Sequence, residues 1–126
     1  MEKQPPEIRS YENRGFQLTF LNGWTISVMF GPGTYSSNRA APRSNWRTDS
    51  HEYKSMTADV SIWDPKGETL KLSAELSHGW SSTDMVAKLI AFTQSLPETV
   101  QVADFDGGPT WRGKLVSILR PEGSRD

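Results

Sequence analysis

Apolar and polar residues alternate along residues 16–30, and the alternation turns at the loop Leu21-Asn22-Gly23. A type I turn closed by a glycine bulge at this loop places the apolar side chains of both strands on one face. A two-residue loop would pair them with residues of the other face. The sequence therefore predicts a hairpin with a three-residue loop. Its predicted cross-strand pairs are Phe20–Trp24, Leu18–Ile26 and Phe16–Val28.

Residues 56–76 follow the same rule around the loop Pro65-Lys66-Gly67. With the glycine again closing the loop, all apolar side chains share one face and polar or charged side chains share the other. This alternation is typical of antiparallel strands with one solvated face. The predicted pairs are Ile62–Leu70, Val60–Leu72, Ala58–Ala74 and Met56–Leu76.

The chain then changes from a period of two to the period of a helix. Ser81 or Ser82 is a typical N-cap, Asp84 follows near the positive end of the helix dipole, and Pro97 ends the helix near Ser95. Apolar residues recur at positions i, i+4, i+7 and i+11, so one face of the helix should pack on the sheet. These residues are Met85, Leu89, Phe92 and Leu96.

Two short strands are predicted after the helix, over residues 99–105 and 114–119, because β-branched and apolar residues recur there around a Gly-Gly-Pro turn. The element order is then β-β-β-β-α-β-β. This pattern indicates an α+β fold: an antiparallel β-meander built from two glycine-bulge hairpins, with one α-helix packed on a face.

The length of 126 residues suits one domain. We expect a flexible N-terminal arm over residues 1–14, a single α+β domain over 15–120 and a C-terminal tail over 121–126. The chain carries 14 basic and 15 acidic side chains, so no overall field attracts nucleic acid or an anionic membrane.

The absence of cysteine excludes disulfides, thiolate metal sites and cysteine nucleophiles, and it is compatible with a reducing cytoplasm. The first residues lack the apolar segment of a signal peptide, so we expect a cytoplasmic protein. The longest charge-free stretch, residues 16–34, is predicted to form a hairpin and not a membrane span, so no membrane partner is expected.

The outward face of the first hairpin carries no charge, whereas that of the second hairpin is charged and looks solvated. The uncharged face lies either under another part of the chain or against a partner. The interface candidates are Thr25, Ser27 and Met29, together with Trp63 on the outward face of the second hairpin.

A long loop follows Gly31-Pro32-Gly33 and reaches about His51 without a regular period. Arginines recur in it every four residues beside aromatic side chains. Such a mixture can bind phosphates and stack on bases, or form the centre of a protein interface, and a solvated loop also explains it. The candidate binding residues are Tyr35, Ser37, Asn38, Arg39, Arg43, Trp46 and Arg47.

Evidence for catalysis is weak, and we predict no catalytic residue, metal site or cofactor. Asp104 and Asp106 would share one face of a strand, and His78 is one of two histidines in the chain. Together these three residues could form a small hydrolase or nuclease site. Ordinary turn composition also explains the two acids.

Three segments of the chain resemble a family of small uncharacterised bacteriophage and prophage proteins. They are Asn22-Gly23-Trp24-Thr25-Ile26-Ser27-Val28, then Gly31-Pro32-Gly33-Thr34-Tyr35 with Asn38-Arg39, and residues 58–63. The resemblance covers about the first half of the chain and brings no activity with it. It implies an accessory protein that acts in a bacterial cytoplasm, and such proteins often bind a host protein.

The sequence thus favours a non-enzymatic interaction protein that binds a host or phage protein and could form a homodimer. The alternatives are nucleic-acid or nucleotide binding through the loop from Tyr35 to Arg47, and the small hydrolase or nuclease.

Overall fold

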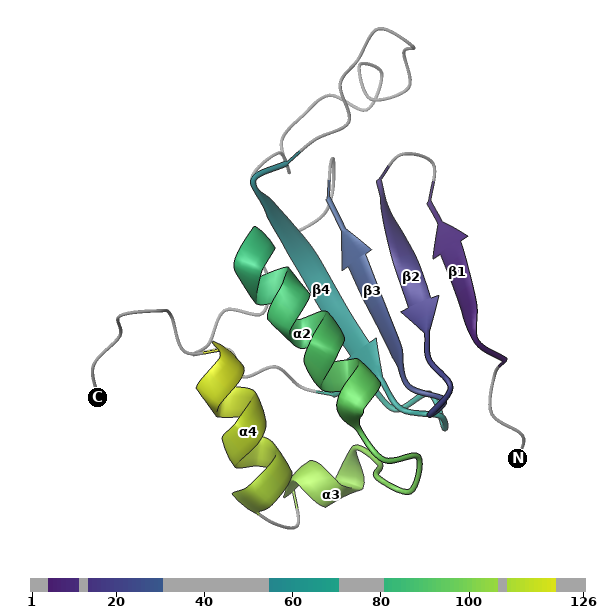
Figure 1. The fold of residues 1–126 in the computed structure, drawn as a ribbon, viewed down its shortest axis with the longest axis vertical. Coiled ribbons are helices and arrows are strands. Elements are labelled where there is room, and N and C mark those ends of the chain that lie inside the picture. Colours follow the sequence, from purple (N-terminus) through teal and green to yellow (C-terminus); the bar gives the residue numbers. More distant parts are fainter. Residues whose placement is uncertain (1–4, 12–13, 31–54, 71–80, 107–108, 120–126) are drawn as a thin grey trace, which may run out of the picture.

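A computed structural model describes residues 5–11, 14–30, 55–70, 81–106 and 109–119 of the chain. In this part of the chain, five strands form one antiparallel sheet in the order β1-β2-β3-β4-β5. Helix α2 crosses one face of the sheet, and α4 lies beside α2 on the side away from β1 (Figure 1). The predicted α+β fold with an antiparallel sheet is confirmed. The elements are β1 (Glu7–Ser10), β2 (Gly15–Thr19), β3 (Thr25–Met29), β4 (Thr57–Trp63), β5 (Ser81–Ser82), α2 (Thr83–Ser95), α3 (Ala103–Asp106) and α4 (Pro109–Leu119).

Both hairpin loops have the predicted geometry. Gly23 and Gly67 each have φ of +87°, a conformation that glycine adopts without the steric cost of a side chain. The Gly23 N–H donates to the Phe20 carbonyl at 2.9 Å, and the Gly67 N–H donates to the Asp64 carbonyl at 2.9 Å. The register of the first hairpin is confirmed, with Leu18 opposite Ile26.

The second hairpin keeps the predicted register close to its loop. The Leu70 N–H donates to the Ile62 carbonyl at 2.8 Å, and Trp63 bridges to Thr69. Farther along β4 the predicted pairing of Ala58 with Ala74 is wrong, because Ala58 pairs with Ser81 of β5. Strand β5 continues directly into α2, so the packing of this helix on the sheet brings β5 to that edge. Leu72, Ala74 and Leu76 lie outside the described residues.

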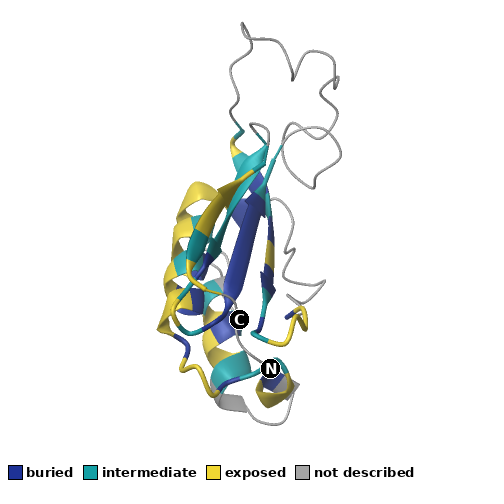
Figure 2. Cartoon of the chain, turned by 90° about the vertical axis from the view of Figure 1, so that its right-hand side faces the viewer, coloured by how far each residue is buried: buried dark blue, intermediate teal, exposed yellow. Residues whose placement is uncertain are grey.

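The core lies between the sheet and α2. Trp24, Ile26 and Val60 are buried on the helix-facing side, against Leu89 and Phe92 of α2. In Figure 2 the buried residues gather in the central strands and on the sheet-facing side of α2, whereas its outer side is exposed.

The predicted boundaries of this helix are confirmed. The Ser82 side chain caps the helix by accepting a hydrogen bond from the Met85 N–H at 3.2 Å. The helix ends at Ser95, two residues before Pro97. The buried face follows the predicted spacing, with Leu89, Phe92 and Leu96 buried, because a period of 3.6 residues places them on one side.

The strand predicted over residues 99–105 is wrong, because a turn and the short helix α3 occupy this segment. Two acidic side chains bind backbone N–H groups just before the helix. Asp104 accepts from the Gln101 N–H at 2.8 Å, and Asp64 of the second hairpin accepts from the Val102 N–H at 2.9 Å. These bonds pair two backbone donors of the turn that precedes the helix, and they outweigh the local β-propensity.

The strand predicted over residues 114–119 is also wrong, because these residues belong to α4. Pro109 occupies its first helical position, where the missing N–H costs nothing. Leu115 is fully buried, and Trp111 and Ile118 pack against the core at the spacing i, i+4 and i+7. The proline and this spacing were the sequence signals of a helix.

The N-terminal segment contains a strand where a flexible arm was predicted, so this prediction is wrong for residues 7–10. Glu7 of β1 lies opposite Thr19, and Ile8 lies opposite Leu18. The Tyr11 N–H donates to the Gly15 carbonyl at 3.0 Å, which continues the ladder into the connection. A strand this short buries little by itself, and the free edge of β2 supplies the pairing that orders it.

The loop of the first hairpin holds the end of α2 through Asn22. Its side-chain N–H group donates to the carbonyls of Thr93 at 2.9 Å and Leu96 at 2.7 Å, and its Oδ1 accepts from the Trp24 N–H at 2.9 Å. The last carbonyls of a helix lack partners within the helix. Asn22 therefore connects the sheet to the helix, because its side chain bonds both to the hairpin backbone and to the last carbonyls of α2.

We expect Asn22→Ala to lower the free energy of unfolding by about 1–3 kcal/mol, because several hydrogen bonds are lost and helix carbonyls lose their partner. Urea unfolding followed by circular dichroism measures this change. The control is Leu21→Ala in the same loop, whose side chain is 79% exposed and should matter little. Equal stability of the Asn22→Ala variant and the wild type would show that the hydrogen bonds from Asn22 to the end of α2 are dispensable.

Candidate functional site

Helix α2 covers only part of the apolar face of the sheet. It packs on β3, β4 and β5, whereas β1 and β2 extend beyond it (Figure 1). On these two strands Phe16 and Leu18 are half-buried, and Ile8 is 82% exposed. A large aliphatic side chain is therefore presented to solvent on the face whose other half forms the core.

The strand register explains this placement. Residues directly opposite each other in antiparallel strands project to the same face. Because Ile8 lies opposite Leu18 and Leu18 lies opposite Ile26, all three share the face that the core occupies.

The side of α2 next to β2 is also apolar. Lys88 and Ala91 face α4 on the other side of the helix. At 100° per residue, Ile90 lies about 200° around the axis from Lys88, which turns it toward β2. Ile90 is half-buried. We call the corner between the sheet and this side of α2 the apolar step. Its residues are Ile8, Phe16, Leu18, Phe20 and Ile90.

The predicted interface residues lie on the opposite face of the sheet. Thr25 is 2% exposed and Ser27 is 8% exposed, so the centre of that face is covered within the monomer. The Thr25 hydroxyl lies 3.0 Å from the Thr19 hydroxyl, which satisfies both groups. Met29 and Trp63 are half-buried. The burial of Thr25 and Ser27 agrees with the alternative that this face lies under another part of the chain, and an interface centred on these four residues stays a prediction.

The predicted binding loop lies outside the described residues, and its use for nucleic acid or nucleotides stays a prediction. This applies to Tyr35, Ser37, Asn38, Arg39, Arg43, Trp46 and Arg47.

The acidic pair lies on a short helix, contrary to the expectation of a strand. Asp104 and Asp106 both belong to the helix α3, which lacks the two-residue period that places side chains on one face of a strand. The Asp104 carboxylate is already bonded to the Gln101 N–H. His78 lies outside the described residues. The arrangement on α3 thus gives Asp104 a structural role.

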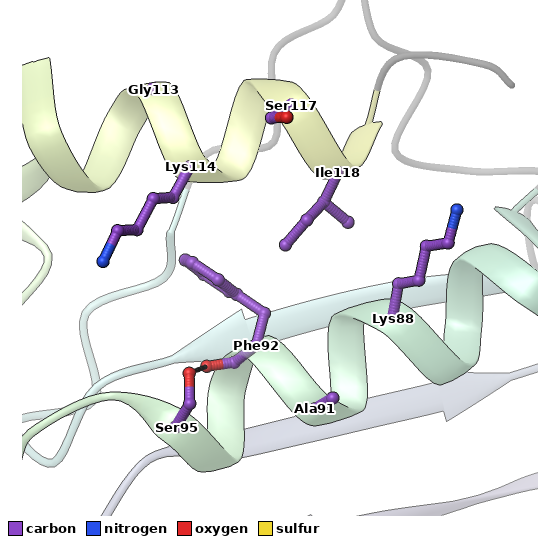
Figure 3. Close-up of a pocket in the computed structure, with 8 residues that line it drawn as sticks. All are labelled: Lys88, Ala91, Phe92, Ser95, Gly113, Lys114, Ser117 and Ile118. Atoms are coloured by element: carbon purple, nitrogen blue, oxygen red, sulfur yellow. Dashed lines mark hydrogen bonds between the residues drawn. The ribbon is translucent and has the colours of Figure 1, made fainter. Parts of the chain in front are cut away.

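A shallow groove of about 800 Å³ runs between α2 and α4 (Figure 3). Phe92 and Ile118 point toward each other across it, and Lys88 and Lys114 lie near them. The Lys114 Nζ lies 4.6 Å from the ring centroid of Trp111, a cation–π contact that holds this lysine beside the helix. Because its described lining contains two lysines and no acid, the groove suits an anionic group, and no described lining residue offers a carboxylate for acid–base chemistry.

The comparisons with protein-family models, curated proteins and solved structures found no match to this chain. Within the five described stretches, no helix has the length and apolar character needed to cross a membrane. Those same stretches contain no group of three His, Cys, Asp or Glu side chains that could hold a metal ion. What the fold and the site define is a small α+β protein with an antiparallel sheet and a partly uncovered apolar face.

Sequence reasoning missed the apolar step because it assigned Ile8 to a flexible arm. The available signal was one isoleucine between charged residues, Glu7 and Arg9. An alternation this short is compatible with a strand, but it is too brief to establish one.

Proposed function

We propose that the protein is a non-enzymatic interaction protein that binds an apolar segment of a protein partner on the apolar step. The observation that carries the proposal is the 82% exposure of Ile8 on the same face as the half-buried Leu18 and Phe16. Contiguous exposed apolar surface often marks an interaction site.

The chemistry of the step favours an apolar segment over a charged one. All five of its residues are apolar, and two are phenylalanines, whose rings contribute large contact areas to interfaces. Burial of an exposed isoleucine side chain contributes about 1.5–3 kcal/mol of binding free energy before the costs of association.

Two of the described acids, Asp64 and Asp104, have structural roles, which supports a role without catalysis. Asp64 is buried and accepts three backbone N–H bonds, from Lys66, Glu68 and Val102. Asp104 holds the segment before α3. Each of these carboxylates has a structural partner that explains its position. The resemblance to bacteriophage proteins makes a bacterial host protein the expected partner.

Affinity capture with surface variants tests the proposal. We expect the tagged wild-type chain to retain one stoichiometric protein from a nuclease-treated bacterial lysate. Ile90→Lys should reduce this retention about tenfold or more, because it places a charge in an apolar contact. The matched control is Ala87→Lys, which adds the same charge at an exposed position of α2. Equal retention by both variants would contradict the proposed surface.

A further inference from the structure

Among the described residues, strand β1 lies at one end of the strand order and leaves that edge of the sheet open, and the ladder fixes which of its backbone groups face outward. The Tyr11 N–H bonds to Gly15, so Tyr11, Arg9 and Glu7 direct their backbone groups toward β2. In an antiparallel ladder alternate residues point the other way. Ile8 and Ser10 therefore direct their N–H and C=O groups to the open edge. Such an edge can pair with a further strand.

The side chains of β1 are complementary to a second copy of themselves. If two β1 strands pair antiparallel about Ile8, Glu7 of one copy lies opposite Arg9 of the other, and the reverse pair forms as well. Within each copy Arg9 Nη2 already lies 2.9 Å from Glu7 Oε1. Glu7 and Arg9 of the two copies would then lie at the corners of a square, so that each charge has neighbours of opposite sign. Opposite charges on facing strands stabilise a sheet.

The backbone favours the same register. With Ile8 opposite Ile8 of the second copy, the two residues exchange both hydrogen bonds, as their outward groups allow. Glu7 and Arg9 then form a non-hydrogen-bonded pair, in which Cα atoms approach to about 4.5 Å. A shift that centres the pairing on Arg9 would place two guanidinium groups face to face, which is unfavourable.

Pro6 sets the length of the pairing. It would lie opposite Ser10 of the second copy, and its carbonyl can accept from the Ser10 N–H although it has no N–H to donate. The paired segment is thus residues 6–10, with Ile8 at the centre. The apolar steps of the two copies would adjoin across this axis, which covers part of the exposed Ile8 side chain.

We propose that two copies of this chain form a symmetric dimer by antiparallel pairing of β1, with Ile8 on the two-fold axis and Glu7 of each copy opposite Arg9 of the other. The small area makes the dimer weak and reversible. The evidence for the dimer is the sheet edge and its charges, although the dimer would cover part of the Ile8 side chain on which the proposed partner site also depends.

Sedimentation equilibrium of the full chain tests this dimer from about 5 μM to about 1 mM, the range suited to so small an interface. We expect a monomer–dimer equilibrium for the wild type. Glu7→Arg and Arg9→Glu should each raise the dissociation constant about tenfold or more, since like charges then face each other. Circular dichroism verifies that each variant is folded.

Two further samples test the register in which the two β1 strands pair. An equimolar mixture of Glu7→Arg and Arg9→Glu should form a heterodimer, because every facing pair is again of opposite sign. The double variant with both exchanges should dimerise like the wild type. A wild type that stays monomeric throughout, an unchanged dissociation constant for Glu7→Arg, or a mixture that stays monomeric would each overturn the proposal. Ile90→Lys lies away from this edge and should leave the dimer intact, which separates this result from that of the partner capture.

Discussion

Replacement of Asp64 by alanine is expected to lower the free energy of unfolding by about 3–5 kcal/mol, among the largest effects for one residue of this chain. The Asp64 side chain is 2% exposed. Its Oδ1 accepts from the Lys66 and Glu68 N–H groups at 2.9 and 3.0 Å, and its Oδ2 accepts from the Val102 N–H at 2.9 Å. Alanine would leave three donors unpaired at the point where the second hairpin meets α3. Urea unfolding monitored by tryptophan fluorescence measures the loss.

Two controls separate the carboxylate from its surroundings. Lys66→Ala removes an exposed side chain but keeps the backbone N–H of residue 66, which still donates to Asp64. The free energy of unfolding of this variant should therefore stay within about 0.5 kcal/mol of the wild type. Asp64→Asn keeps one carbonyl oxygen but turns an N–H group toward backbone donors, and it should fall between the wild type and the alanine variant. A loss below about 1 kcal/mol for Asp64→Ala would show that the three bonds are replaced by water.

Gly15→Ala is the second substitution with a large expected cost, at least about 3 kcal/mol. Gly15 begins β2 with φ of +142°, a conformation that residues with a side chain rarely adopt. A Cβ atom there would lie 2.0 Å from the Val28 carbonyl oxygen, well inside van der Waals contact. Strands β2 and β3 would have to separate to admit it. The midpoint of thermal unfolding reports the effect.

Gly113→Ala is the matched control for this change. Gly113 lies in α4, and a Cβ atom there would meet no heavy atom of the described residues within 4 Å beyond its chain neighbours and the adjacent backbone of its own helix. Alanine favours a helix interior over glycine by about 1 kcal/mol, so this variant should be more stable than the wild type. The same chemical change is thus expected to have opposite signs at the two positions. A Gly15→Ala variant as stable as the wild type would contradict the close approach of β2 and β3.

The parts of the fold that sequence reasoning predicted are those governed by local rules. A loop that ends in glycine fixes the register of each hairpin, as the matching bonds around Phe20 and Asp64 show. The helix α2 begins at a serine cap and stops before Pro97 for equally local reasons.

The parts that it missed depend on partners distant in sequence. Val100 and Val102 have the β-branched side chains of a strand, yet Asp64 binds the Val102 N–H across 38 positions of the chain. The Val100 carbonyl accepts from the Trp24 indole N–H at 3.0 Å. A local pattern contains neither contact. The candidate site was missed for a related reason, since the exposure of Ile8 follows from how far α2 extends over the sheet.

The attachment of α2 and α3 to the two hairpin loops also bears on how the chain avoids misfolded pairings. A one-residue slip within a hairpin turns every side chain of the moved strand to the opposite face. Such a slip would carry Asn22 away from the carbonyls at the end of α2, or Asp64 away from the Val102 N–H. The helices can therefore dock fully only on correctly paired strands. Through Asn22 and Asp64, the helices that follow in the chain favour the correct strand pairing over the alternatives.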